Sequence, residues 1–362
     1  MHRTKVGFIG SGFVSDIHAE AFRDVPQAEV VAVASPTEAH VKAFAQKHGI
    51  PNTYTDYRQL LERDDIEVVT LAAPNYLHCE ITEAAAAAGK HVICEKPLCV
   101  TMAEADRMIS ACKKAGVKLM YAEELCFTPK YVRLKQLADS GALGDLYMVK
   151  QCEKHDGPHS PWFWDVEKSG GGVTLDMGCH AFCFFLWMYN WMRPTSVYAD
   201  MVTFMHKDKT RGDDNATIIV NFPDGRSAIA EESWAKKGGM DDRAEAFGTQ
   251  GCSYAVLHMD IALRTYSEVG YDYVVEKAPV STGWSYTIYE ELWNYGFPQE
   301  MRHFIDCVRD DREPLVTGEH GKLVHEMVFG AYASAGRRAA VNFPFAPPPD
   351  AKPYEMWLGA AR

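Results

Sequence analysis

An aspartate and a histidine four residues apart stand out in the stretch "SGGGVTLDMGCH", residues 169–180. On one continuous helix Asp176 and His180 would share a face, where a carboxylate can orient an imidazole and raise its basicity. Histidine titrates near neutrality, which suits a base that removes a hydroxyl proton. The spacing predicts an acid/base pair. The alternative is a structural histidine beside a glycine-rich turn.

A glycine-rich loop follows the first apolar run of the chain, in "VGFIGSGFVSDIH", residues 6–18. Gly10 and Gly12, with Ser15 as the third small residue, allow the backbone to approach a pyrophosphate at a helix N-terminus. The loop predicts a dinucleotide site that includes Gly10, Gly12, Phe13 and Val14. A plain strand-to-helix turn is the alternative interpretation.

The second apolar run ends in "VVAVASPTEAH", residues 30–40, without the acid that usually binds the NAD ribose. An arginine that would bind a 2′-phosphate is also missing there. Ser35 and Thr37 are therefore the expected ribose contacts. We expect NAD as the cofactor, with NADP not excluded.

Short β-branched runs alternate with amphipathic stretches through the first third of the chain, which predicts a parallel sheet covered by helices. The predicted elements are 5–9, 15–25, 29–34, 37–48, 67–72, 77–88, 91–93 and 102–115. Later segments are richer in strands, with a hairpin between 216–221 and 227–233. Helices are expected at 128–140 and 318–337.

These patterns predict an α/β protein with two domains and a tail. Residues 1–121 form a Rossmann dinucleotide-binding domain, and residues 122–345 form a substrate-binding and oligomerisation domain. The second domain is expected to be α+β, with an open, mainly antiparallel sheet. The Pro-rich segment 346–362 is expected to lie extended on the surface.

Composition narrows the class of partner. The chain has 362 residues, 47% of them hydrophobic, and a net charge of −12, which argues against nucleic acid and membrane as partners and favours a small molecule. A strand pattern begins directly after the N-terminus, so a cytoplasmic protein is expected. Ten cysteines without a CxxC pair indicate reduced thiols, and no metal site is expected.

Several motifs occur in one order: GxGxxS, PNxxH, EKP, GGGxxxDxGxH and "PQEMRHFIDCV". This order resembles the glucose–fructose oxidoreductase, inositol dehydrogenase and MocA family, from about residue 4 to residue 342. The resemblance implies a Rossmann domain followed by an α/β domain that often supports oligomers, here a dimer or tetramer. It also implies NAD(P)-dependent oxidation of a sugar or polyol, or reduction of the corresponding ketone.

The resemblance places three residues at catalytic positions: Lys96, Asp176 and His180. His180 is then the acid/base, and Lys96 polarises the reacting oxygen. On the cofactor side, the same resemblance implies contacts from Pro74, Asn75, His78, Glu95 and Lys96.

The expected substrate contacts depart from the family in one place. After the strand at 118–121 the chain reads "YAEELCFTP", with Glu123 and Glu124 and no arginine, which favours hydroxyls or a cation over an anion. The loop "EKHDGPHSPWFWD", residues 153–165, adds tryptophan faces that stack on sugars. The predicted substrate contacts are Lys96, Glu123, His155, His159, Trp162, Trp164, Asp176 and His180.

Three alternatives stay open. Glu153, His155, His159 and His180 could bind a metal, although their spacing matches no standard site. Some relatives keep NAD bound and cleave glycosides through transient oxidation, with the same residues. A sensor that binds sugar or nucleotide without chemistry is the third alternative.

Overall fold

The computed structural model describes residues 2–258, 262–271, 281–288 and 290–359. The chain divides into two compact units. The first comprises Met1–Phe127, Gly296–His325 and Pro348–Asp350, and the second comprises Thr128–Tyr295, Glu326–Pro347 and Ala351–Arg362. Both units therefore recruit segments from late in the chain.

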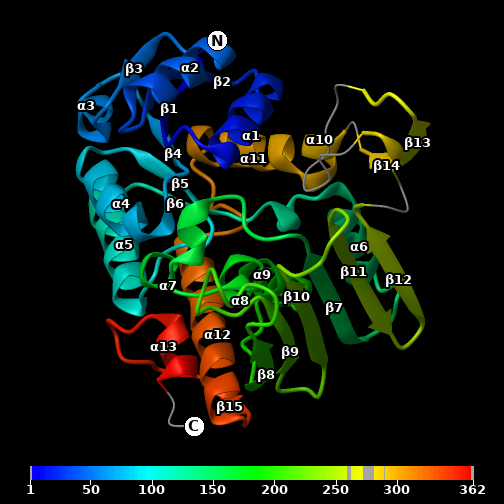
Figure 1. Cartoon of the computed structure of the whole chain (residues 1–362). Coiled ribbons are helices and arrows are strands. Elements are labelled where there is room, and N and C mark those ends of the chain that lie inside the picture. The colour runs from blue at the N-terminus through cyan, green and yellow to red at the C-terminus, as the bar shows by residue number, and fades with distance from the viewer. Residues whose placement is uncertain (1, 259–261, 272–280, 289, 360–362) are drawn as a thin grey trace. The chain divides into compact units, whose positions relative to one another are not determined.

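The first unit contains a six-stranded parallel sheet in the order β3-β2-β1-β4-β5-β6 (Figure 1). Its strands are β1 (Thr4–Ile9), β2 (Ala28–Ala34), β3 (Asn52–Tyr54), β4 (Val68–Leu71), β5 (His91–Glu95) and β6 (Leu119–Ala122). The chain reverses direction between β1 and β4, where such sheets bind ligands at the carboxyl ends of the strands. This confirms the predicted Rossmann fold, although the short strand β3 was not predicted.

Helices surround this sheet. They are α1 (Phe13–Ala21), α2 (Glu38–His48), α3 (Tyr57–Leu61), α4 (His78–Ala87), α5 (Met102–Ala115) and α11 (Phe297–Arg309). Helix α5 has the predicted bounds, because Thr101 and Glu104 form a capping box and Gly116 ends the helix in the left-handed conformation. Helix α4 packs on α5, and α11 packs on α1.

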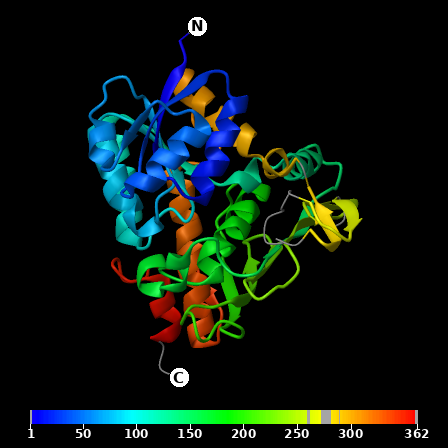
Figure 2. The same cartoon turned by 45° about the horizontal axis from the view of Figure 1, so that its top comes forward.

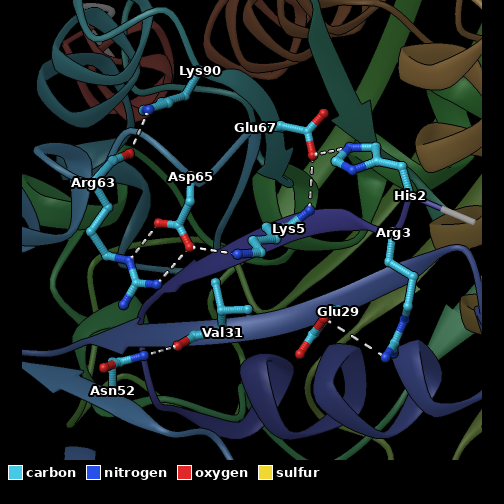
Figure 3. Close-up of polar contacts among 10 residues, drawn as sticks. All are labelled: His2, Arg3, Lys5, Glu29, Val31, Asn52, Arg63, Asp65, Glu67 and Lys90. Atoms are coloured by element: carbon cyan, nitrogen blue, oxygen red, sulfur yellow. Dashed lines mark hydrogen bonds and ion pairs between the residues drawn. The ribbon is translucent and has the colours of Figure 1, made fainter.

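Polar contacts fasten the sheet at the amino ends of its strands (Figure 3). The Lys5 ammonium lies 3.0 Å from the Asp65 carboxylate, and Lys90 Nζ donates to the Arg63 carbonyl at 2.8 Å. The Lys5 backbone N–H also donates to Glu67. The opposite, carboxyl ends carry the polar residues of the candidate site.

The second unit contains a seven-stranded sheet in the order β12-β11-β7-β10-β9-β8-β15 (Figure 1). Its strands are β7 (Leu146–Lys154), β8 (Ser196–Val202), β9 (Asn215–Asn221), β10 (Ser227–Ser233), β11 (Asp241–Gly248), β12 (Gly251–Val256) and β15 (Val341–Asn342). All neighbours are antiparallel except β7 and β10, which are parallel. The predicted, mainly antiparallel sheet is confirmed.

Helix α9 (Gly178–Met188) packs on β7 and β10, and all of its residues are buried. Its aromatic run therefore belongs to the core. The other helices of this unit are α6 (Pro129–Asp139), α7 (Val166–Ser169), α8 (Val173–Asp176), α10 (Glu291–Tyr295) and α13 (Pro353–Leu358). Helix α12 (Gly318–Arg337) has the predicted bounds and passes from the first unit into the second.

Two further strands, β13 (Leu263–Ser267) and β14 (Gly283–Thr287), pair with each other in a two-stranded ribbon (Figure 2). Within the described residues, no helix is long and apolar enough to cross a membrane. None of the ten cysteines forms a disulfide, and nine are buried, as expected for reduced thiols.

The Pro-rich tail differs from the prediction of an extended segment. Residues 353–358 form α13, because Pro353 occupies the first helical turn, where its missing N–H costs nothing. Tyr354 is buried, and its hydroxyl donates to the Glu167 carboxylate at 2.6 Å. The Tyr354 side chain thus anchors a segment that its proline-rich composition predicted to be extended.

Candidate functional site

In the glycine-rich loop after β1, no side chains at Gly10 and Gly12 separate the backbone from a phosphate group. Gly10 has φ +120°, and a Cβ there would come within 2.5 Å of the Ala72 carbonyl oxygen after β4. Gly12 is the N-cap of α1, and a Cβ there would meet nothing within 4 Å. Phe13 and Val14 form the first turn, whose N–H groups and dipole attract anions.

One acid lies in that first turn and is neutralised locally. Asp16 accepts from Lys47 Nζ at 3.0 Å and lies 2.6 Å from His48 Nε2, both on α2. Without these partners its charge would oppose a phosphate at the helix N-terminus. The loop therefore fits the pyrophosphate of a dinucleotide.

The end of β2 offers hydroxyl groups where many Rossmann folds have an acid. Ser11 Oγ donates to Ser35 Oγ at 2.9 Å and joins the glycine-rich loop to this strand end. Thr37 follows as the N-cap of α2, and its side chain makes no capping hydrogen bond. Neutral hydroxyls at this position accept a ribose hydroxyl and do not repel a 2′-phosphate.

The end of β4 is held by a buried histidine. His78 Nε2 lies 2.8 Å from the Ala73 carbonyl, and Nδ1 lies 3.1 Å from the Pro97 carbonyl. Burial lowers the pKa of His78 below its ordinary value. A neutral ring has one N–H, so one of these contacts is a hydrogen bond at a time. The ring fastens the segment that contains Pro74 and buried Asn75 to the turn after β5.

That turn carries Lys96. Glu95 ends β5, and its carboxylate lies 2.8 Å from His18 Nε2 and accepts the Lys96 backbone N–H at 3.1 Å. Burial would raise the pKa of Glu95, but His18 and Lys96 outweigh burial and lower it below the ordinary value. His18 Nδ1 lies 2.9 Å from Thr70 Oγ1. Glu95 is thus an ionised carboxylate that fixes the backbone of Lys96.

Further carboxylates gather near this lysine. Glu123, directly after β6, is fully buried, and burial raises its pKa to about 8 against the opposing charge of Lys96. Glu300 of α11 is also fully buried, and its pKa is raised well above the ordinary value by burial and by the charges of Glu124, Glu95 and Glu123. Lys96 therefore lies near two acids, Glu95 and Glu123, and Glu300 lies near both of these.

In the second unit, an unpredicted aspartate shapes the glycine-rich turn before the catalytic candidates. Asp213 accepts from Thr174 Oγ1 at 2.6 Å, from the Thr174 N–H at 2.9 Å and from the Gly172 N–H at 3.2 Å. A Cβ on Gly172 would lie 2.0 Å from the Asp213 carbonyl oxygen. Burial raises the pKa of Asp213, despite these donors.

The predicted single helix for Asp176 and His180 is wrong. Asp176 ends α8 and α9 begins at Gly178, with Met177 between them. The turn tightens there, since the His180 N–H donates to the Met177 carbonyl three residues back. The Asp176 carboxylate accepts from the Trp234 indole N–H at 3.2 Å. Both residues are buried and only four positions apart in the chain, but each lies on its own helix.

The loop before this turn brings its aromatic residues together in two groups. The rings of His155 and His159 lie 5.5 Å apart, with His155 buried and His159 exposed. Trp162 stacks on Phe163 at 3.8 Å. Half-buried Trp164 packs edge-on against Trp234 at 5.3 Å, and Trp234 is the buried residue that donates to Asp176.

Sequence reasoning missed His18, Asp213 and Glu300. Each is a buried polar residue among other polar residues in the sequence, so its burial cannot be inferred from its neighbours in the chain. Their roles depend on partners 39 or more residues away, such as Thr174 for Asp213. Spacing along the chain does not contain that information.

Comparison with known proteins identifies both parts of the chain. Residues 4–123 match the model of an oxidoreductase family with an NAD-binding Rossmann fold, named GFO_IDH_MocA. Residues 131–253 match the GFO/IDH/MocA C-terminal domain.

Individual relatives agree with these family matches. Myo-inositol 2-dehydrogenase of Thermotoga maritima is 26% identical over 93% of this chain and 98% of its own. GenD2 from gentamicin A biosynthesis, solved with NAD, is 28% identical, with a TM-score of 0.89 over 95% of this chain and 97% of its own. Levoglucosan dehydrogenase, solved with NADH and L-sorbose, shares the fold, with a TM-score of 0.81 at 23% identity over 96% of this chain and all of its own. The chain belongs to the GFO/IDH/MocA oxidoreductase family, with an NAD-binding Rossmann domain at its N-terminus.

Proposed function

We propose that this enzyme oxidises a hydroxyl group of a sugar, polyol or glycoside, or reduces the corresponding ketone, with NAD as the preferred partner. The observation that carries the proposal is the order of residues along the carboxyl ends of the parallel strands. A glycine-rich cradle follows β1, and a lysine with a fixed backbone follows β5. The cradle after β1 would hold the pyrophosphate of a dinucleotide, and Lys96 would lie on the nicotinamide side.

Each polar residue has a distinct role in this proposal. His180 takes the hydroxyl proton during oxidation and returns it during reduction, as an imidazole does near neutrality. Lys96 donates a hydrogen bond to the reacting oxygen and stabilises its developing charge. Asp176, held by the Trp234 indole, orients the imidazole. When bound, the nicotinamide supplies the hydride acceptor or donor.

The remaining contacts follow from the strand ends and the loop. Gly10, Gly12, Phe13 and Val14 hold the pyrophosphate, and the hydroxyls of Ser35 and Thr37 bind the adenosine ribose. The nicotinamide side is lined by Pro74, Asn75, Glu95 and Lys96, with His78 acting through the two turns that it joins. The proposed substrate contacts are Glu123, His155, His159, Trp162 and Trp164.

The substrate class is supported by the names of the relatives. Myo-inositol 2-dehydrogenase is named for a polyol, and levoglucosan dehydrogenase was solved with L-sorbose, a sugar. The half-buried ring of Trp162, stacked on buried Phe163, and the buried acid Glu123 suit a ligand that has C–H faces and hydroxyl groups.

Substitution of the two proposed catalytic residues tests the mechanism. Lys96→Ala and His180→Ala should each lower kcat by at least about 100-fold, because each removes a group that acts on the reacting oxygen. Dissociation constants for NAD, measured by calorimetry, should stay within about threefold of the parent value for His180→Ala, since this residue contacts the substrate only. Full activity in both variants would refute the assignment.

The state of the cofactor separates dehydrogenase from glycosidase. The protein is denatured as purified, and released dinucleotide is quantified by mass spectrometry. We expect little retained NAD(H) and net NADH formation with sugar and NAD. Near-stoichiometric NAD(H) together with glycoside cleavage and no net NADH would instead identify an internal redox cycle.

We also propose that the enzyme is a homo-oligomer that uses the outer face of the seven-stranded sheet. Strand register places Tyr198, Ile219 and Ile229 side by side on that face, and their row continues through Lys150 and Glu245 to Tyr254. Tyr198, Ile219 and Tyr254 are exposed. An exposed apolar sheet face of this kind is typical of a contact between subunits.

A further inference from the structure

Three carboxylates lie side by side on the inner face of the seven-stranded sheet. Glu153 of β7 pairs with Glu232 of β10 on one side and with Asp242 of β11 on the other. Residues opposite each other on neighbouring strands have Cβ atoms about 5 Å apart. All three side chains are buried, Glu232 and Asp242 completely. Three ionised groups so close together require a positive partner or must bind protons.

Within the described residues the two outer members, Glu232 and Asp242, form no ion pair, although the charge of Lys154 partly offsets the effect of burial on the pKa of Glu232. Neither carboxylate oxygen of Glu232 has a hydrogen-bond partner among the described residues, and neither does Oδ2 of Asp242. The other Asp242 oxygen accepts from the Tyr131 hydroxyl at 2.6 Å. Lys154, the next residue after Glu153, lies on the opposite face and pairs with Glu231.

The buried side chain of Gln151 lies on the same face of the sheet as the three carboxylates. Gln151 precedes Glu153 by two residues, so both side chains point to the inner face, and its neighbours across the sheet are the small residues Ala230 and Ala244. It is 1% exposed, and neither Oε1 nor Nε2 makes a hydrogen bond of normal geometry within the described part of the chain. The amide lies within reach of the Asp242 carboxylate, whose pKa it lowers, so it extends the polar surface of the acidic row.

The carboxylates also lie near the proposed catalytic residues. Trp234 follows Glu232 by two residues, about 7 Å along the strand direction. Its indole N–H donates to the Asp176 carboxylate. A ligand that reaches from His180 toward β7 and β10 would therefore meet the acidic row, and these distances lie within this one unit of the chain.

We infer that the substrate carries a protonated amine, which binds to Glu153, Glu232 and Asp242 while Gln151 binds a neighbouring hydroxyl. This inference rests on the proposed function and names its substrate class as an amino sugar or aminocyclitol. An ammonium group has three donors and can bridge carboxylates on adjacent strands. A metal ion needs its ligand atoms gathered more closely than the described members of this row are.

The experiment compares matched pairs of probes on the full-length enzyme with NAD. The pairs are D-glucosamine with D-glucose, D-galactosamine with D-galactose, and scyllo-inosamine with scyllo-inositol. Turnover is followed as NADH formation, and binding is followed by ligand-detected NMR. At least one amine should exceed its hydroxyl counterpart in kcat/KM by about tenfold or more, the value of a hydrogen bond to a charged group.

Two variants, at the adjacent residues Glu232 and Glu231, test whether the preference for amines depends on the acidic row. Glu232→Gln should reduce the amine-to-hydroxyl ratio of kcat/KM by at least about tenfold, because it removes a buried charge. Glu231→Gln is the matched control, since Glu231 lies on the same strand but on the outer face, with Lys154. If circular dichroism shows that Glu232→Gln does not fold, Glu153→Gln serves the same purpose.

The outcomes separate this inference from the proposed function. If the enzyme oxidises hydroxyl sugars in a reaction that depends on His180 but shows no preference for amines, the amine site is refuted. The proposed oxidoreductase activity is then still supported. Amine binding that depends on Glu232, without NADH formation, would support the site and refute the proposed activity. An unchanged preference in Glu232→Gln means that the row holds protons only, and this overturns the inference. Absence of both amine binding and amine turnover also overturns it.

Discussion

At the scale of single residues, the backbone of Lys96 is fixed by the side chains of Glu95 and His18. The Glu95 carboxylate accepts the Lys96 backbone N–H, and His18 holds that carboxylate from α1. Ionisation of Glu95 depends on His18 and Lys96, because burial alone would raise its pKa. His18 is therefore a positioning residue for the proposed chemistry.

Substitution of His18 tests this arrangement. His18→Leu should lower the free energy of unfolding by about 3 kcal/mol, because it leaves a buried carboxylate without its partner. The acid limb of the kcat profile should also move to higher pH, since the pKa of Glu95 rises. Denaturant titration and pH–rate curves measure both effects. His18→Leu combined with Glu95→Gln should recover part of the stability, and no recovery would argue against the pairing.

Glu123 predicts how stability depends on pH. Burial raises its pKa from 4.5 to about 8, so the folded state binds a proton that the unfolded state has lost between these values. This contribution is fully present below pH 4.5 and is lost as pH rises through about 8. The melting temperature should therefore fall over this range, and Glu123→Gln should flatten the fall. A parallel curve in the variant would show that Glu123 is ionised when folded.

At the scale of elements, the proposed site residues lie where strands and helices end. The sequence predicts such an end well where local residues determine it, and poorly where a distant residue does. Glycine spacing and alternating patterns identified β1, β5 and α5 closely, because the signals are local. The break between α8 and α9 was missed, and so was the turn before α8, which Asp213 holds through Thr174 from 39 residues away. The acidic row was missed for the same reason, because strand register brings Glu153 and Glu232 together.

The turn before α8 makes a prediction of its own. Gly172→Ala should destabilise the protein by about 3 kcal/mol or more and lower kcat, because the added Cβ would lie 2.0 Å from the Asp213 carbonyl oxygen. Gly178→Ala is the control, since its Cβ would meet Thr174 Cγ2 at an ordinary 3.4 Å. Thermal unfolding and kinetics compare the two. Equal effects would show that Asp213 does not constrain the turn.

At the scale of the whole molecule, the sheet of the second unit offers a test of assembly. Ile219 lies exposed in the row between Tyr198 and Ile229. Ile219→Glu should dissociate the proposed oligomer, because a charge replaces an apolar contact at the centre of the face. Sedimentation velocity measures the mass before and after. A parent protein that sediments as a monomer would refute the oligomer.

The first unit is completed by residues far along the chain. Helix α11, residues 297–309, packs on α1, and Arg302 donates to the Asp24 carbonyl while Arg309 donates to the His2 carbonyl. During synthesis on a ribosome, the strands of the first unit emerge early. The helix α11 that packs on α1 is made only after residue 296, so the first unit stays incomplete until then. The nascent N-terminal part would meanwhile expose the apolar surface of α1, which makes it a substrate for chaperones. A fragment that ends at residue 127 would keep that surface exposed permanently and should aggregate.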